Sequence, residues 1–288
     1  MRIIEDLAEM KAEALNMLIK KKKCGLVPTM GALHQGHMSL VERSVAENDV
    51  TVMSIFVNPT QFMPGEDYDA YPRTWDEDIA KAKAAGVDIV FHPSAEQMYL
   101  PRRQTSIQVH ELTKTLCGMS RGQGHFIGVT TVVTKLFNLV RPTRAYFGQK
   151  DAQQALVIQR MVIDLNIPVE LVVCPIVREP DGLAMSSRNR NIPAKLRPRA
   201  VYLREAMLIG REMIRNREYS PNAIFNAMCE HILRDNEIEI DYLHIVSPET
   251  LQDVETIDDM VLIAGAIRIG EVRLIDNMLI GPNGPWED

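Results

Sequence analysis

The stretch that decides the fold of this 288-residue chain begins with a short apolar run, Cys24-Gly25-Leu26-Val27, and continues as Pro28-Thr29-Met30-Gly31-Ala32-Leu33-His34-Gln35-Gly36-His37. The residues after it, Met38-Ser39-Leu40-Val41-Glu42-Arg43, have a helical pattern. A strand, a glycine-bearing turn and a helix together make a place that holds phosphate, because glycine lets the backbone come close and helix-start N–H groups attract an anion. The pattern therefore predicts an anion site.

Two imidazoles stand at the start of this helix. His34 and His37 are three residues apart, so they lie on one face once the helix has begun, and each can donate a hydrogen bond to a phosphate oxygen. The alternative is a pair of partly buried histidines satisfied by the backbone. A metal site has little support, because two histidines without a further clustered ligand do not make one, and the metal ligands stay unknown.

Strand and helix patterns alternate through the first 175 residues. Continuous apolar strands that are each followed by a helix indicate a parallel sheet covered on both faces, which binds ligands at the carboxyl ends of its strands near the switch point. The predicted strands are 24–28, 50–57, 87–91, 144–147 and 169–174, and the predicted helices are Ile4 to about Ile19, 37–47, 74–85, 130–140 and 151–165.

The pattern of predicted helices and strands changes after about residue 176. Helices are predicted at 194–217 and 221–235, and strands at 238–243, 260–264 and 268–276, the last beginning with a turn. The predicted fold class is therefore α/β: a Rossmann-like parallel sheet with helices on both faces, plus a smaller C-terminal α+β domain. The predicted domains are residues 1–176 and 177–288, the second closing over the active site.

Two further polar segments follow predicted strands. Asn58-Pro59-Thr60-Gln61 suits amide side chains that bond a small polar substrate, although a plain proline-containing turn fits equally well. Gly148-Gln149-Lys150-Asp151 opens a helix, where Lys150 can contact phosphate, Asp151 a ribose hydroxyl, and Gln154, one turn on, the same cleft. A capped helix with solvated polar residues is the alternative for this segment.

A hydroxyl-rich segment, Arg178 to Arg190, lies at the predicted domain junction. Within it, Ser186, Ser187 and Arg188 form a compact cluster of donors for a polyphosphate, and an interdomain turn is the alternative. By contrast, Gly122 to Gly128 only resembles a dinucleotide fingerprint, because its spacing is GxGxxxG and no strand is predicted before it.

Composition excludes several classes of protein. The chain is 46% hydrophobic and 24% charged, which is ordinary for a globular protein, and its net charge of −6 disfavours a nucleic-acid partner. No stretch approaches 18 apolar residues and the N-terminus has no apolar signal region, so we expect no membrane association. Four cysteines without a CxxC pair, Cys24, Cys117, Cys174 and Cys229, suit reduced thiols in the cytoplasm, with Cys24 and Cys174 in the core.

Together these segments closely resemble the pantoate–β-alanine ligase (pantothenate synthetase) family of the nucleotidylyltransferase-like superfamily with its HxGH signature. The resemblance runs almost end to end. It covers PTMGALHQGH, FVNPTQF, EDYDAYPRT, GHFIGVTTVV, YFGQKDAQQ, VREPDGLAMSSRN, DYLHIVSPETL and RLIDN.

The resemblance implies a two-step reaction. Pantoate attacks the α-phosphorus of ATP to give pantoyl adenylate and pyrophosphate, and β-alanine then attacks the acyl carbon to give pantothenate and AMP. It also implies Mg²⁺ as a phosphate-bound ion with few protein ligands, near Glu77 and Asp78, and a homodimer formed through the N-terminal domain. A nucleotidyltransferase acting on another small acid or phosphate is the first alternative, and a nucleotide-binding regulator is the second.

The resemblance also assigns residues. His37 matches the proton donor to the leaving phosphate, with His34, Lys150 and Arg188 as further catalytic residues. Gln61 and Gln154 hold pantoate, Gln61 also lies near β-alanine, and Asn58 is placed in the substrate-binding set. The ATP-binding set is Met30, Gly31, Ala32, Leu33, His34, Gln35, Gly36, His37, Gly148, Gln149, Lys150, Asp151, Val177 (through its backbone), Met185, Ser186, Ser187 and Arg188.

The chain departs from the family pattern at two places. The family commonly has an arginine three residues before the histidine of its GHF motif, whereas Arg121 lies four residues before His125. Phe62-Met63-Pro64-Gly65 also lacks the usual glycine directly after Gln-Phe. The role of Arg121 and the loop beside the pantoate pocket are therefore open, while the phosphate-handling residues are unaffected.

Overall fold

The computed structural model describes residues 1–66 and 68–282, so Asp67 of the EDYDAYPRT motif lies outside the described residues. The chain forms two compact units. The first consists of Met1–His110, Arg121–Gln149 and Gln154–Val177, and the second of Glu111–Ser120, Lys150–Gln153 and the chain from Arg178 onward. The predicted division between residues 176 and 177 stays a prediction.

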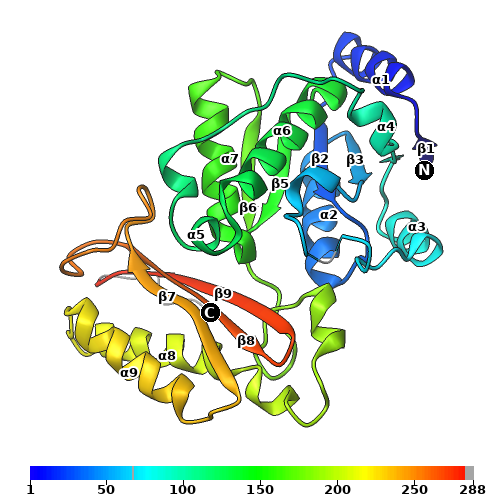
Figure 1. Ribbon diagram of the computed structural model, residues 1–288. Coiled ribbons are helices and arrows are strands. Elements are labelled where there is room, and N and C mark those ends of the chain that lie inside the picture. The colour runs from blue at the N-terminus through cyan, green and yellow to red at the C-terminus, as the bar shows by residue number, and fades with distance from the viewer. Residues whose placement is uncertain (67, 283–288) are drawn as a thin grey trace. The chain divides into compact units, whose positions relative to one another are not determined.

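The first unit is built on a parallel sheet of order β1-β4-β3-β2-β5-β6 (Figure 1). The strands that follow β2 in the chain, β3 and β4, lie on one side of β2 in the sheet, and β5 and β6 lie on its other side. The carboxyl ends of β2 and β5 are therefore the switch point, where such sheets bind ligands. The strands are β1 (Arg2–Ile4), β2 (Cys24–Thr29), β3 (Val50–Ile55), β4 (Ile89–Phe91), β5 (Arg144–Gly148) and β6 (Glu170–Cys174).

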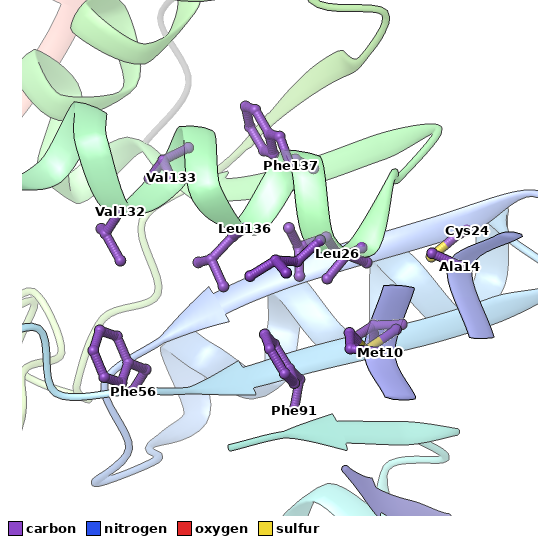
Figure 2. Close-up of a cluster of buried hydrophobic side chains, with 14 of the residues drawn as sticks. Met10, Ala14, Cys24, Leu26, Phe56, Phe91, Val132, Val133, Leu136 and Phe137 are labelled. Carbon is purple, nitrogen blue, oxygen red and sulfur yellow. The ribbon is translucent and has the colours of Figure 1, made fainter. Parts of the chain in front are cut away.

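Helices cover both faces of this sheet. Successive strand residues point to opposite faces, so each strand contributes side chains to the contacts with the helices on both sides. Leu26 packs under α6 and α1, as Figure 2 shows, whereas Val27 packs against α2 on the other face. This two-sided burial is why the strands have continuous apolar sequences. The helices are α1 (Leu7–Ile19), α2 (Gln35–Glu47), α3 (Trp75–Ala84), α4 (Ala95–Met98), α6 (Gln123–Val140) and α7 (Ala152–Asp164), with 3-10 turns η1 (Pro59–Gln61) and η3 (Gln149–Asp151).

The second unit contains an antiparallel sheet of order β7-β8-β9 packed against α8 and α9. The predicted fold class, a Rossmann-like parallel sheet with a smaller α+β part, is confirmed. The elements of this unit are η2 (Glu111–Thr113), α5 (Cys117–Arg121, its last residue in the first unit), η4 (Ser187–Asn191), η5 (Arg197–Arg199), α8 (Tyr202–Arg215), α9 (Pro221–Leu233), β7 (Ile238–Val246), β8 (Val261–Ile269) and β9 (Val272–Ile280).

Several predicted boundaries are wrong. Ile4 ends the unforeseen strand β1, and α1 starts later because the Asp6 carboxylate caps it by accepting from the N–H groups of Ala8 and Glu9. The helix predicted at 194–217 begins only at Tyr202, because the residues before it form a turn and η5, which contains Pro198. The strand predicted at 268–276 is divided between β8 and β9, because Gly270 turns the chain at φ +57°.

The helix predicted at 130–140 begins at Gln123 instead. Its first turns contain Gly124 and Gly128, which have low helix propensity and hide the pattern in the sequence.

The cysteines agree with the prediction, since Cys24 and Cys174 are buried and all four cysteines have free thiols. No helix of the described chain is long and apolar enough to cross a membrane.

Candidate active site

The two histidines of the opening motif cap α2 with their own rings. His34 is the N-cap, and its Nδ1 accepts from the N–H of Gly36 at 3.1 Å, while Nδ1 of His37 accepts from the N–H of His34 at 3.3 Å. A backbone N–H can only donate, so both Nδ1 atoms are acceptors and a neutral ring has its proton on Nε2. The ring centroids are 4.1 Å apart, so two Nε2–H donors stand side by side.

This arrangement combines the two possibilities that the sequence left open. The rings are satisfied by the backbone at Nδ1, yet each has its second nitrogen, Nε2, as a donor. The N–H groups of His34 and Gly36 are already bonded to imidazole nitrogens, so the rings, rather than those two amides, present donors at the start of α2. Both side chains are half-buried and therefore reachable.

Asn58 orients Gln61 just after β3. The Asn58 amide donates to Gln61 Oε1 at 3.0 Å and to the carbonyl of Gly128 at 3.2 Å, and its carbonyl accepts from the hydroxyls of Thr60 and Tyr99. These contacts use both N–H bonds and both lone pairs of the amide. Asn58 is 2% exposed, so the described contacts give it a supporting role, while the half-buried Gln61 presents its NH₂ group.

His125 supports the same turn from α6. Its Nδ1 donates to the carbonyl of Gln61 at 2.7 Å, and its Nε2 accepts from Arg121 at 3.1 Å. The remaining guanidinium N–H groups of Arg121 form two bonds with Glu66, at 2.8 and 2.6 Å. Arg121 thus connects the 62–66 loop to His125 despite its shifted spacing. Sequence reasoning quoted His125 only as part of a motif and missed its function.

The Glu66 carboxylate remains ionised in this network. Burial alone would raise the pKa of Glu66, but hydrogen bonds and the charge of Arg121 outweigh it and hold that pKa below its ordinary value of 4.5. The ion pair is a quarter exposed or less, so it is shielded from solvent more than a surface pair.

The last glycine of the GxGxxxG segment, Gly128, serves packing. A Cβ on Gly128 would lie 2.3 Å from the carbonyl oxygen of Thr60 and 2.6 Å from the nitrogen of Gln61. Only glycine lets α6 approach η1 this closely. The expectation that this segment is not a dinucleotide fingerprint agrees with its position inside a helix.

Gln154 lies in the first turn of α7, after β5, and is half-buried. Gln61 follows β3, and β2 separates β3 from β5 in the sheet. Because parallel strands end at one edge, both glutamines stand at the edge that carries His34 and His37. Met30 reaches Gln61 directly, with 3.2 Å between its sulfur and Gln61 Nε2.

The second unit gathers the predicted phosphate donors that follow β5 and β6. Lys150 Nζ donates to the carbonyl of Met185 at 2.8 Å, and Asn277 donates to the carbonyl of Lys150 at 3.0 Å. The hydroxyl of Ser186 accepts from the N–H of Arg188 at 3.2 Å and starts η4. Lys150 and the loop Met185–Arg188 are therefore neighbours, although 35 positions separate Lys150 from Met185.

The Lys150 ammonium has a lowered pKa. Burial is the main cause and the Arg188 charge adds to it, while Asp151 and Asp276 oppose the shift. A lysine that loses its proton no longer attracts phosphate, so we expect kcat/KM for ATP to fall on the alkaline side below the ordinary lysine pKa of 10.5.

The pH profile of kcat/KM for ATP measures this limb. Lys150→Arg stays protonated and should move the limb to higher pH even if its rate is lower. If kcat/KM falls at the same alkaline pH in the wild-type protein and in Lys150→Arg, a group other than Lys150 causes the fall.

The described residues offer no ready metal cage. No group of three or more His, Cys, Asp or Glu side chains within residues 1–66 and 68–282 is arranged to hold a metal ion. Asp78 is 1% exposed and accepts from the N–H groups of Ala32 and Leu33, and Glu77 lies on the surface beside Lys81. These residues fit Mg²⁺ only as an ion that stays on the ATP phosphates.

A parallel sheet whose switch point carries paired imidazole donors defines a nucleotide-binding α/β enzyme. The family model described as pantoate–beta-alanine ligase matches residues 2–279. A pantothenate synthetase of Thermotoga neapolitana is 54% identical over 281 residues, which cover 98% of this chain and 100% of that protein. The chain belongs to the pantoate–β-alanine ligase family.

Solved structures agree. A pantothenate synthetase of Thermus thermophilus superposes with a TM-score of 0.91 at 46% identity, covering 96% of this chain and 99% of that one. A ligase of Francisella tularensis, complexed with beta-gamma ATP and beta-alanine, has a TM-score of 0.80 at 35% identity, covering 98% and 99%. The predicted ligase activity is confirmed over the nucleotidyltransferase and regulator alternatives.

Proposed function

We propose that this ATP-dependent ligase condenses pantoate with β-alanine through an enzyme-bound pantoyl adenylate. A pantoate carboxylate oxygen bonds to the α-phosphorus of ATP, and the bond to the β-phosphate bridging oxygen breaks, which releases pyrophosphate. The β-alanine amine then bonds to the acyl carbon, the bond to AMP breaks, and the amine loses a proton. The observation that carries the proposal is the pair of Nε2–H donors at the switch point.

Donors that are already in place matter most for the first step. Its transition state spreads negative charge over phosphate oxygens, and donors that need no reorganisation stabilise that charge. The resemblance makes His37 the proton donor, but a neutral ring whose Nδ1 accepts keeps its Nε2 proton, so we assign His37 and His34 as hydrogen-bond donors to the leaving pyrophosphate. In the second unit, Lys150, Ser186, Ser187 and Arg188 are proposed, from the resemblance, to bind phosphate.

The remaining ATP contacts rest on the resemblance. Backbone groups from Met30 to His37 and from Gly148 to Asp151, with Val177 three residues after β6, would bind the nucleotide. We propose that Mg²⁺ enters bound to ATP, where it neutralises phosphate charge.

Gln61 and Gln154 would hold pantoate, since amide groups can both donate to a carboxylate and accept from hydroxyls. We expect Gln154→Ala to raise KM for pantoate about 10-fold, the size of one lost hydrogen bond to a charged group, with KM for ATP little changed. Steady-state kinetics with each substrate varied in turn measures this. A change in ATP dependence alone would show that Gln154 faces the nucleotide.

We propose that the chain is a homodimer formed through its first unit. β6 is an edge strand of the sheet with Val173 46% exposed, and Ile163 and Leu165 nearby in the sequence are also exposed. Apolar side chains beside an unpaired strand edge favour association. Sedimentation equilibrium should give twice the chain mass of 32.5 kDa, and the single-chain mass would contradict the proposal.

We also propose that the protein is located in the cytoplasm. Its four free thiols fit that reducing compartment.

Pyrophosphate release with ATP, Mg²⁺ and D-pantoate, with and without β-alanine, tests the reaction. A single-turnover burst without the amine, which becomes continuous turnover when the amine is added, supports the acyl adenylate. Pyrophosphate release only in the presence of β-alanine would contradict an independent first step. No release in either case would mean that the acid substrate is wrong.

A further inference from the structure

The peptide before the first histidine is held from α3. Asp78 is 1% exposed, and its carboxylate accepts from the N–H groups of Ala32 and Leu33, each at 2.8 Å. The hydroxyl of Thr74 donates to the same carboxylate at 3.1 Å. A buried carboxylate that accepts from several donors is held firmly, because charge-assisted hydrogen bonds are the strong ones.

Lys81 holds the other side of the same residue. Its Nζ donates to the carbonyl of Leu33 at 2.8 Å. Asp78 and Lys81 are three positions apart on α3, so they lie on one face of that helix. Leu33 is therefore bonded at both its N–H and its C=O, and the next residue is His34, the N-cap of α2.

The held turn has a backbone that would not form without support. Gly31 has φ +84° and Ala32 has φ +51°, and an L residue such as Ala32 rarely adopts a left-handed conformation. A Cβ on Gly31 would lie 3.0 Å from the Asp78 carboxylate. The carboxylate thus replaces the contacts that a relaxed turn would make, which is how strained backbone persists at functional sites.

We propose that Asp78 and Lys81 are positioning residues that set the direction of the His34 and His37 Nε2–H groups toward the phosphates. The inference rests on the proposed function of those rings. Asp78 acts through the Ala32–Leu33 peptide and touches no substrate, which gives this acidic residue a task distinct from binding Mg²⁺. Without the two bonds to the peptide, the N-cap residue is free to shift, and a shift of about 1 Å at reacting groups is enough to lose 10²-fold in rate.

Asp78→Asn tests this with minimal change of shape. The new NH₂ group faces a backbone N–H where an acceptor is needed, so one of the two bonds must break. We expect single-turnover pyrophosphate release to fall roughly 10- to 100-fold. We also expect the imidazole ¹⁵N signals of His34 and His37 to leave the pattern of an accepting Nδ1 and a protonated Nε2. Asp76→Asn removes a carboxylate charge from an exposed position in the same first turn and should leave both readouts unchanged.

A second variant keeps the test decisive if Asp78→Asn does not fold. Lys81→Met keeps the apolar stem but loses the donor to Leu33 and the exposed ion pair with Glu77, which contributes little to stability. We therefore expect the rate of pyrophosphate release to fall roughly 10-fold with little change in Tm.

Three results would overturn the proposal: wild-type rates in both variants, slow release with unchanged imidazole signals, or a loss that extra Mg²⁺ restores. The last would make Asp78 a metal-site residue. An inactive wild-type protein would instead contradict the proposed function, while the ¹⁵N signals would still report on positioning.

Discussion

Replacing His37 by alanine is expected to slow pyrophosphate release by roughly 10²-fold or more, the scale of losing one donor that stabilises transition-state charge. The substitution removes the Nε2–H group that we propose as a donor to the phosphate. It also removes the Nδ1 acceptor for the N–H of His34, so one of the two ring-to-backbone bonds that cap α2 is lost with the donor. Single-turnover release of pyrophosphate from ATP and pantoate measures the effect.

A second substitution separates the two losses. His37→Gln can still accept from the N-cap N–H, since glutamine is a regular partner at this position of a capping box. We expect His37→Gln to keep the Tm of the wild-type protein and to remain slow, because an amide N–H is a weaker hydrogen-bond donor to phosphate than an imidazole N–H. His244→Ala, which affects a ring paired with Asp253 in the second unit, is the matched control and should be unchanged. Unchanged release in His37→Ala would refute the catalytic role.

Gly128→Ala is expected to lower kcat/KM for pantoate by about 10²-fold, although Gly128 touches no substrate. The added methyl group would lie 2.3 Å from the carbonyl oxygen of Thr60 and 2.6 Å from the nitrogen of Gln61. Both neighbours are backbone atoms, so η1 must shift, and a shift of about 1 Å in Gln61, which we propose binds pantoate, would cost this much. Overpacking of about 1–3 kcal/mol should also lower the Tm by several degrees.

Gly124→Ala is the matched comparison, one helical turn earlier on α6. Its Cβ would lie 2.9 Å from the sulfur of Met63, which is the end of a flexible side chain that can move away. We expect a change of less than about threefold in kcat/KM for pantoate. Equal effects of the two substitutions would show that loss of helix flexibility, rather than displacement of Gln61, explains the Gly128 result.

The alternation of apolar runs was enough to predict the first unit. Strands such as β2 and β3 are buried on both faces, so most of their residues are apolar, with Thr29, Thr51 and Ser54 as buried polar exceptions, and such runs are typical of a covered parallel sheet. The exact ends of the helices and strands were harder to predict from the sequence. α6 carries glycines for contact with η1, and that tertiary demand overrides helix propensity over residues 123–129.

The chemistry of the site divides in the same way. The sequence alone determined that His34 and His37 open a helix after a strand and that the motifs resemble one ligase family, and it predicted phosphate binding by Lys150 and by Ser186 to Arg188 from their residue types. Those conclusions depend on residue types and on short spacings, which the chain itself carries. The family comparison confirmed the last of them.

Only the tertiary structure decided which nitrogen of each ring is the donor and which residues hold the site in place. Asp78 lies 45 positions from Leu33, and His125 lies 64 positions from Gln61. No local pattern marks such partners, because a carboxylate or an imidazole reads as an ordinary polar residue until folding buries it against a backbone group. Hydrogen bonds between distant segments, formed once the sheet and its helices pack, therefore settled the geometry of the predicted residues.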